Sequence, residues 1–405
     1  MRKVYVNAEP VITGGRPVRK KLLDFHKPQI GQDEIKAVNS VLKSGWLTKG
    51  PKTREFEEKF GAYVKAKYAV GLNSCSSALD LALKVLSVKA GDEVITTPLS
   101  FASTANAIIH CGARPVFVDV NPNDLNIDPV MIEKAITKKT KCILPVHLYG
   151  QPCDMKSILR LARKKNIFVV EDAAHALEAV HQNKKIGGIS DITCFSFHPG
   201  KNITCAEGGM LVTNNKAIAV RAQIMSFHGI EKDTWRRHNK GKIGDFTQVE
   251  AGYKYNMSDV QAAIGLCQLK RIKIFQRKRR EYSWLYNKAF SKLPQVRVLT
   301  RNSVQGNENG YHMFVIEIIQ ESLKISRDFF LKALLAENIT AGIHYPSLHL
   351  QPYFQKKYNY RKGMLPNAEF VSGRIISLPL YPKMTRTDVE SVIQAVIKIA
   401  NYYRK

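Results

Sequence analysis

The sequence has no CxxC pair and no apolar run near the length of a membrane span. Its seven cysteines are scattered, and an odd, unpatterned set excludes a disulfide framework and a clustered zinc site. After "MRK" the chain turns polar within a few residues, so it has no signal-peptide core. A bilayer span needs roughly 18–20 apolar residues. We therefore expect a soluble cytoplasmic protein with reduced thiols and no membrane partner.

Acidic residues are scarce, with 34 Asp and Glu against 62 Lys and Arg, a formal charge of +28. Such a balance suits an anionic partner, either nucleic acid, a membrane surface or an anionic small molecule. The densest basic run, "LKRIKIFQRKRRE" at 269–281, raises the alternative of a nucleic-acid-binding regulator. Its charges fall around a predicted helix instead of forming one stripe with interleaved aromatics. This pattern favours a solvated helix face and no nucleic-acid partner.

The 405 residues, 44% of them hydrophobic, suffice for two domains. Between residues 66 and 215, short β-branched runs such as "KYAVGLN" and "IFVVEDAAHAL" alternate with helical patterns. This alternation predicts an α/β fold with a mostly parallel sheet between helices. The last hundred residues mix strands and helices, which indicates a smaller α+β domain. We expect an N-terminal arm over 1–24, a large domain over 25–270 and a small C-terminal domain over 271–405.

Small polar residues open a predicted helix in "LNSCSSALDLAL", at Asn73–Ser77. Free N–H groups and the helix dipole at such a position favour an anion. Ordinary N-capping by serine explains the same residues. Ligands of open parallel sheets bind at the carboxyl ends of the strands. That position favours the anion site.

An acidic pair, Glu171-Asp172, ends a buried apolar strand. An unpaired buried charge is costly, so a partner is expected. The pair could form a structural ion pair, bind a metal or balance a cationic cofactor ring. No His/Cys/Asp cluster at metal spacing accompanies it, which disfavours the metal.

One lysine, Lys201, lies in the polar segment "CFSFHPGKNITCAEGG" between Ser196 and Thr204. An amine in a partly desolvated pocket has a lowered pKa and becomes a nucleophile toward carbonyls. An anion-binding helix start, a strand-end aspartate and such a lysine together predict pyridoxal 5'-phosphate. The helix start would hold the phosphate, Asp172 the ring nitrogen, and Lys201 would form the Schiff base.

Seven stretches in order resemble the DegT/DnrJ/EryC/StrS group of sugar-nucleotide aminotransferases, which are fold type I pyridoxal-phosphate enzymes. They are "GGRPVR", "SGWLTKGPKTREFEEKF", "EDAAHALEA", "FSFHPGKNITCAEGGMLVTN", "GYKYNMSDVQAAIGLCQL", "HYPSLHLQPYF" and "SLPLYPKMT". The resemblance covers nearly the whole chain. The stretches "FSFH..KNITCAEGG" and "GYKYN" are similar to those of enzymes that make 4-amino sugars for bacterial surface glycans, such as UDP-4-amino-4-deoxy-L-arabinose.

The resemblance implies a role for each matching residue. Lys201 would form the Schiff base and move the proton, and Asp172 would hold the ring nitrogen. The cofactor would also be contacted by Cys75, Ser76 and Ser196 at the phosphate, Phe101 on the ring face, His175 beside the ring and, from the partner subunit, Asn256. Cys75 departs from the Gly-Thr or Ala-Thr pair of the family. A residue shared in this way implies a symmetric homodimer with shared active sites.

The implied reaction is ping-pong transamination from L-glutamate, which leaves as 2-oxoglutarate, to a keto-sugar nucleotide. A 4-keto hexose or pentose is expected. The substrate pocket is expected to use Trp46, Leu47, Thr48, His198, Arg236, Arg237, His344 and Tyr345.

Relatives on the same scaffold carry out other reactions. Some act on cyclitols or on an aminobenzoate precursor, and the sequence separates these poorly from sugar aminotransferases. Others are deoxysugar dehydratases, in which histidine replaces the lysine, so Lys201 argues against that branch.

Overall fold

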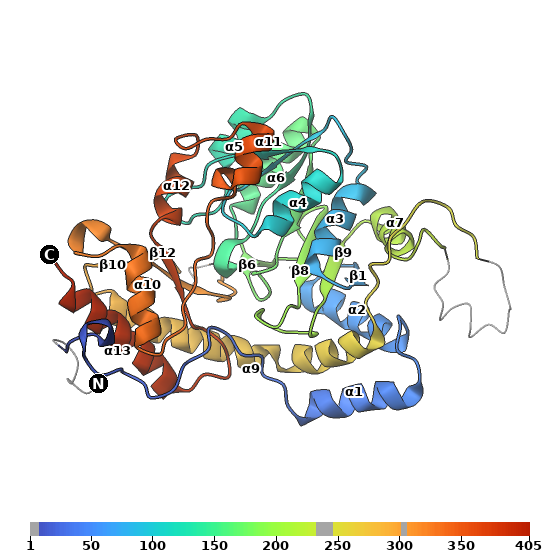
Figure 1. The fold of residues 1–405 in the computed structure, drawn as a ribbon. Helices are drawn as coiled ribbons and strands as arrows, with labels where there is room; N and C mark the ends of the chain where they lie inside the picture. The colour runs from blue at the N-terminus through green and yellow to red at the C-terminus, as the bar shows by residue number, and fades with distance from the viewer. Residues whose placement is uncertain (1–7, 232–245, 301–305) are drawn as a thin grey trace.

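The structure, a computed structural model, describes residues 8–231, 246–300 and 306–405 (Figure 1). Its main element is a seven-stranded sheet. The strands, in spatial order, are β1 (Tyr68–Leu72), β9 (Gly209–Thr213), β8 (Ile192–Ser196), β5 (Phe168–Asp172), β4 (Thr140–Leu144), β2 (Glu93–Thr96) and β3 (Arg114–Phe117). Strand β9 is antiparallel to β1 and β8, and the other neighbours are parallel. The predicted mostly parallel sheet is confirmed.

Helices cover both faces of this sheet because successive side chains of its strands point to opposite sides. Val94 and Val170 belong to one apolar layer, whereas their neighbours Ile95 and Val169 belong to another. The first layer includes α3 (Cys75–Val85), α4 (Ala102–His110) and α7 (Lys216–Ser226). The other face is covered by α2 (Pro51–Val64), α5 (Pro129–Ala135), α6 (Met155–Lys165) and the first half of α9 (Asp259–Phe290). Burial on both faces explains why these strands are continuously apolar.

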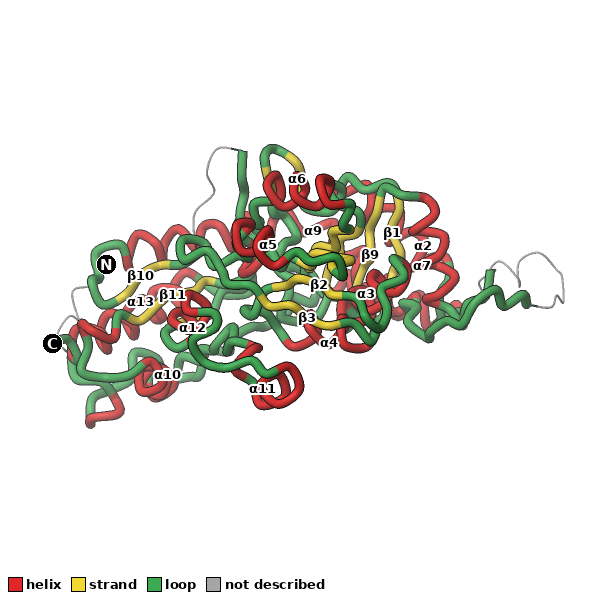
Figure 2. Tube along the Cα trace, turned by 90° about the horizontal axis from the view of Figure 1, so that it is seen from above, coloured by secondary structure: helices red, strands yellow, loops and turns green. Residues whose placement is uncertain are grey.

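A smaller antiparallel sheet lies beside the first (Figure 2). It consists of β10 (Val296–Val298), β11 (Phe314–Ile318) and β12 (Ile375–Leu378), and it packs with α10 (Arg327–Ala336) and α13 (Arg386–Tyr402). Helix α9 runs without a break beneath both sheets (Figure 1). The boundary that we expected at residue 270 therefore lies inside this helix. The remaining short elements are η1 (Val11–Thr13), η2 (Leu148–Gly150), β6 (Val180–His181), β7 (Lys184–Lys185), η3 (Gln320–Ser322) and η4 (Leu348–Leu350).

The N-terminal arm is tied to the C-terminal elements before the chain reaches α1 (Gln32–Ser44). The backbone N–H groups of Val11 and Val18 donate to the Glu337 carboxylate. Lys398 pairs with the same carboxylate at 2.7 Å, and both side chains are fully buried. A buried carboxylate needs such partners, so the arm completes the packing of this region.

The segment with α11 (Pro352–Tyr358) and α12 (Pro366–Ser372) returns to the edge of the large sheet beyond β3. The Phe354 ring lies 5.1 Å from that of Phe117, and Asp119 accepts from the backbone of Asn367 and Ala368. This return brings the residues just before α11 to the carboxyl ends of the strands.

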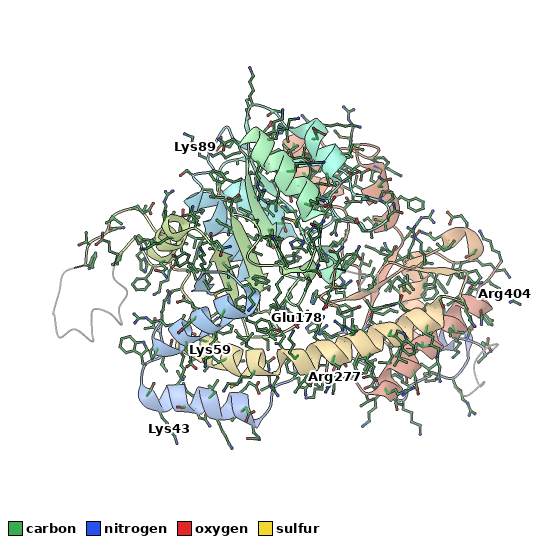
Figure 3. The ribbon with its side chains drawn as sticks, turned by 180° about the vertical axis from the view of Figure 1, so that it is seen from behind. Lys43, Lys59, Lys89, Glu178, Arg277 and Arg404 are labelled. Carbon is green, nitrogen blue, oxygen red and sulfur yellow. The ribbon has the colours of Figure 1, made fainter. Side chains whose placement is uncertain are left out.

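The basic run at 269–281 forms the middle of α9, and much of its charge is used within the chain. Arg271 pairs with Glu34, Lys273 with Glu178 and Arg280 with Glu308. Figure 3 shows Arg277 on this helix. Arg279 is buried, so the expectation of a solvated face is wrong for that residue.

No helix within residues 8–231, 246–300 and 306–405 is long and apolar enough to cross a membrane.

Candidate active site

A cavity of about 390 Å³ opens where strands β5 and β8 end and helix α3 begins. It collects ten of the sixteen residues that the sequence analysis singled out. These ten are Cys75, Ser76, Phe101, Asp172, His175, Ser196, His198, Lys201, His344 and Tyr345. We call two groups of lining residues by their origin. The sheet-end residues are Cys75, Ser76, Phe101, Asp172, His175, Ser196 and Lys201, and the C-terminal residues are His312, Met313, His344, Tyr345, Leu378 and Leu380.

The start of α3 lines the cavity with small polar groups. Ser74 is the N-cap, and its hydroxyl accepts from the Ser77 N–H. Strand β9 passes very close, because a Cβ on Gly209 would lie 2.3 Å from the Ser74 carbonyl oxygen. Only glycine permits this approach. Cys75 and the exposed Ser76 line the cavity at this helix start, where backbone N–H groups favour an anion.

Asp172 lies at the end of β5 and is 4% exposed. Its Oδ2 accepts from the Thr104 hydroxyl at 2.8 Å, and its Oδ1 accepts from the Ala174 N–H at 3.1 Å. Thr104 is in turn bonded to the Ser100 hydroxyl at 2.6 Å. Burial raises the pKa of Asp172, against the effects of the two donors and of Lys201. The carboxylate would be stabilised further by a cationic partner in the cavity.

Lys201 lies in the turn that follows β8, where its N–H donates to the His198 carbonyl. Desolvation lowers the pKa of its amine to about 8, against the opposing effects of Cys75 and Asp172. A neutral amine is thus accessible near physiological pH. Such an amine is a competent nucleophile toward an aldehyde.

A chain of hydrogen bonds fixes the protonation of His175. Its Nδ1 accepts from the Tyr149 N–H at 3.3 Å, so its proton lies on Nε2, which is 3.1 Å from the Tyr345 hydroxyl oxygen. Burial lowers the pKa of His175 well below its usual value, which keeps the ring neutral. With Nε2 as the donor, the Tyr345 hydroxyl keeps its own hydrogen for a ligand.

The sequence matches the DegT/DnrJ/EryC1/StrS aminotransferase family over residues 28–397. The chain belongs to this family. It is 44% identical to the spore coat polysaccharide biosynthesis protein SpsC of Bacillus subtilis over 93% of this chain and 97% of that protein. The enzyme is therefore a pyridoxal-phosphate-dependent aminotransferase of the sugar aminotransferase type.

Solved structures of similar chains give the same result. Spr1654 of Streptococcus pneumoniae, described as a sugar aminotransferase, matches in its pyridoxal phosphate form with a TM-score of 0.87 and 31% identity, over 94% of this chain and 98% of that one. Helicobacter pylori PseC, an aminotransferase of pseudoaminic acid biosynthesis, matches with a TM-score of 0.86 and 30% identity, over 94% and 99%. The fold of this aminotransferase is fold type I.

The cavity of the aminotransferase fits its cofactor. Asp172 is a buried carboxylate suited to a protonated ring nitrogen, and Lys201 is an amine suited to the aldehyde. The start of α3 offers N–H groups and the Ser76 hydroxyl to a phosphate. Phe101, 62% exposed at the cavity, presents an aromatic face for stacking.

Some predicted residues lie elsewhere in the aminotransferase. Trp46, Leu47 and Thr48 form the loop between α1 and α2, where Leu47 and Thr48 carbonyls accept from the Asp259 N–H at the start of α9. These three residues do not line the cavity in the single chain. Arg236 and Arg237 lie outside the described residues.

Asn256 also lies outside the cavity of its own chain. It forms a bridge with Leu72, and its buried Oδ1 has no hydrogen-bond partner among the described residues.

Several lining residues were not predicted. Ser100 lines the cavity and Thr104 behind it bonds to Asp172; both follow β2, so the rule for strand ends could have found them. His312 is 4% exposed and lies 4.3 Å from the His175 ring, and Phe25 stacks on His344. No sequence signal marks these two, because distant segments bring them to the site.

Proposed function

We propose that this aminotransferase moves an amino group from L-glutamate to the keto group of a sugar nucleotide. A 4-keto hexose or pentose is the expected acceptor. The aminated sugar would serve the synthesis of a surface glycan, in keeping with the names of SpsC and PseC.

The observation that carries this proposal is the unequal chemistry of the two groups of lining residues. Both ionised side chains of the sheet-end residues, Asp172 and Lys201, are suited to the cofactor. The C-terminal residues bear no carboxylate, lysine or arginine, and their polar members are two imidazoles and a phenol. Neutral groups that donate and accept hydrogen bonds, beside apolar side chains, suit the hydroxyls and ring of a sugar.

The imidazoles of the C-terminal residues are neutral at neutral pH. Desolvation, with Lys201 nearby, lowers the pKa of His344 to about 4, and burial lowers that of His312 well below its usual value. The His344 Nδ1 is 3.0 Å from the Ser377 hydroxyl, which orients the ring. At neutral pH these rings can bind hydroxyl or keto oxygens without a change of charge.

Within the sheet-end residues, we assign the roles that the resemblance implies. When bound, pyridoxal phosphate supplies an electron sink that allows the C–H bond next to nitrogen to break. Asp172 keeps the ring nitrogen protonated, and Thr104 holds Asp172. The Nζ atom of Lys201 anchors the cofactor and then carries the proton between the substrate carbon and the cofactor carbon. Cys75, Ser76 and Ser196 bind the phosphate.

A homodimer with shared active sites is part of the proposal. Phe101 is largely exposed at the cavity. Away from the cavity, Ile35 and Leu42 on α1 are also exposed apolar side chains. The buried Oδ1 of Asn256 lacks a partner among the described residues, and a second subunit would bring this amide to the other cavity.

The proposal can be tested with the purified holoenzyme in two stages. L-Glutamate, L-glutamine, L-alanine and L-aspartate are added separately, and the loss of the visible absorbance of the bound cofactor is followed. We expect the fastest loss with L-glutamate. The aminated enzyme is then given keto-sugar nucleotides, a keto-cyclitol and an aminobenzoate precursor, and products are identified by mass spectrometry. Amination of the cyclitol alone, or conversion of the aminobenzoate precursor alone, would refute the sugar assignment.

A further inference from the structure

Arg279, in the basic run of α9, is the largest fully buried side chain of the described residues, at 2% exposed. Within the same part of the chain it has no carboxylate partner. All of its hydrogen bonds go to backbone carbonyl groups. Burial lowers the pKa of this guanidinium to about 9, which still leaves it charged at neutral pH. A buried cation held only by carbonyls is costly, so its presence needs an explanation.

The carbonyls that Arg279 binds come from three separate segments. One terminal nitrogen donates to Leu380 at 2.8 Å, to His312 at 3.0 Å and to Tyr311 at 3.3 Å. The other reaches the carbonyl of Lys201 at 3.5 Å. Lys201 lies after β8, His312 before β11 and Leu380 after β12. One side chain therefore joins the turn of Lys201 to two segments that carry C-terminal residues of the cavity.

The shape of the guanidinium explains why arginine is used here. It presents five donors in a rigid planar fork, and a lysine ammonium is a compact point charge that cannot span the same positions. The neighbouring amide of Asn202 adds a second connection between the same regions, donating to Gly310 at 2.7 Å and to Leu177 at 3.1 Å. The turn of Lys201 is thus held from two sides.

We propose that Arg279 is a positioning residue that sets the place of Lys201 relative to the C-terminal residues. The inference rests on the proposed role of Lys201 as the lysine that binds the cofactor. Arg279 does not line the cavity, and it acts through the backbone of Lys201 and His312. A displacement of about 1 Å at a reacting group can cost about 10²-fold in rate.

Two variants separate the effects of the planar guanidinium of Arg279, of its charge and of its volume. Arg279→Lys keeps the positive charge but not the planar guanidinium. Arg279→Met keeps a long side chain with neither the charge nor the guanidinium. The matched control is Gln276→Met, one turn earlier on α9. Gln276 is also buried, and its amide donates to the Asn309 carbonyl, outside the turn of Lys201.

Two measurements report on Lys201 itself. Pyridoxal 5'-phosphate is titrated into each cofactor-free protein, and its dissociation constant is taken from the visible absorbance. Borohydride then fixes the bond between Lys201 and the cofactor, and peptide mass spectrometry gives the modified fraction against time. The Tm of each cofactor-free protein is recorded in parallel. None of these measurements needs glutamate or a sugar nucleotide, so a wrong donor or acceptor leaves the test intact.

We expect Arg279→Lys and Arg279→Met to slow modification of Lys201 by about 10²-fold, while Gln276→Met stays within about threefold of the wild type at a comparable fall in Tm. Full recovery in Arg279→Lys would show that charge alone suffices and would overturn the inference. So would equal losses in Gln276→Met. If both Arg279 variants failed to fold while the control folded, Arg279 would be assigned to stability alone, against the proposal. A wild-type protein that leaves Lys201 unmodified would instead refute the role of Lys201.

Discussion

The two groups of residues that line the cavity differ in how the chain brings them together. The sheet-end residues come from the ends of neighbouring strands and from the helix starts that follow them. The C-terminal residues come from β12 and from segments next to the second sheet, and His344 and Tyr345 belong to the segment that returns to the large sheet before α11. The first group carries Asp172 and Lys201, the second has no carboxylate, lysine or arginine, and Glu207 lines the cavity outside both groups. We therefore propose that the regular part of the fold carries the chemistry, and that the part assembled over long distances recognises the substrate.

The largest effect is expected from Lys201→Ala among the sheet-end residues. The variant removes both the covalent anchor and the proton carrier, so transamination should fall by at least about 10⁴-fold. Borohydride should no longer attach the cofactor to the chain. Lys43→Ala on the exposed face of α1 is the control and should keep full activity. Retention of borohydride labelling in Lys201→Ala would move the anchor to another lysine.

Asp172→Asn should have the next largest effect. An amide cannot keep the ring nitrogen protonated, so the rate should fall by about 10²–10³-fold. Visible spectra of the half-reaction with L-glutamate measure this loss. Near-normal turnover would contradict the assigned role.

The adjacent Glu171 provides a control for Asp172, because it is a carboxylate on the opposite face of the same strand. It lies 2.8 Å from His147 Nε2 and also accepts from Ser190 and Thr193, with both members of the pair fully buried. Glu171→Gln should therefore destabilise the protein, by about 3 kcal/mol, measured by denaturant unfolding. Its turnover per folded molecule should stay close to that of the wild type.

The fold was predictable because it depends on local patterns. Alternating strands and helices indicated the mostly parallel sheet. Its strand order was not predicted, because neighbours such as β1 and β9 lie far apart in the sequence. The role of α9 was harder to predict, because the sequence of a continuous helix carries no sign of which sheet each half contacts. A boundary at residue 270 was a reasonable expectation, yet one helix serves both sheets.

The site was predictable where its residues lie at the carboxyl ends of parallel strands, because these ends meet at one edge of the sheet. Asp172 ends one buried strand and Lys201 follows another, and the structure places both residues at the same cavity. His312 and Arg279 could not be found in this way, because their surroundings are set by segments more than thirty residues away. Arg279 shows the limit of prediction from sequence. A dense basic run is typical of a solvated helix face, and only the packing of α9 shows that this arginine is buried.

Thr104→Val tests the support of Asp172 and should have a moderate effect. The Thr104 hydroxyl donates to the carboxylate, which stabilises its ionised form and lowers its pKa. Removal of this donor should raise the pKa of Asp172. Activity requires the ionised carboxylate. As the pH is lowered, the variant should therefore lose activity at a higher pH than the wild type. We expect about a tenfold loss of kcat at neutral pH and an acid limb displaced upward.

A matched variant separates the hydroxyl of Thr104 from its methyl group. Thr104→Ser keeps the donor to Asp172, so its pH profile should resemble that of the wild type. An unchanged acid limb in Thr104→Val would show that Asp172 is held by other groups.

The smallest effect is expected from Tyr345→Phe, which tests the C-terminal residues. The variant keeps the ring and removes the hydroxyl that His175 orients. Loss of one neutral hydrogen bond should raise the KM for the keto-sugar nucleotide by about threefold to tenfold. The half-reaction with L-glutamate should be nearly unchanged, because that step uses the sheet-end residues. Half-reaction spectra measure both. Equal losses in the two half-reactions would place Tyr345 in the chemistry common to both substrates, and the division between the two groups of residues would then fail.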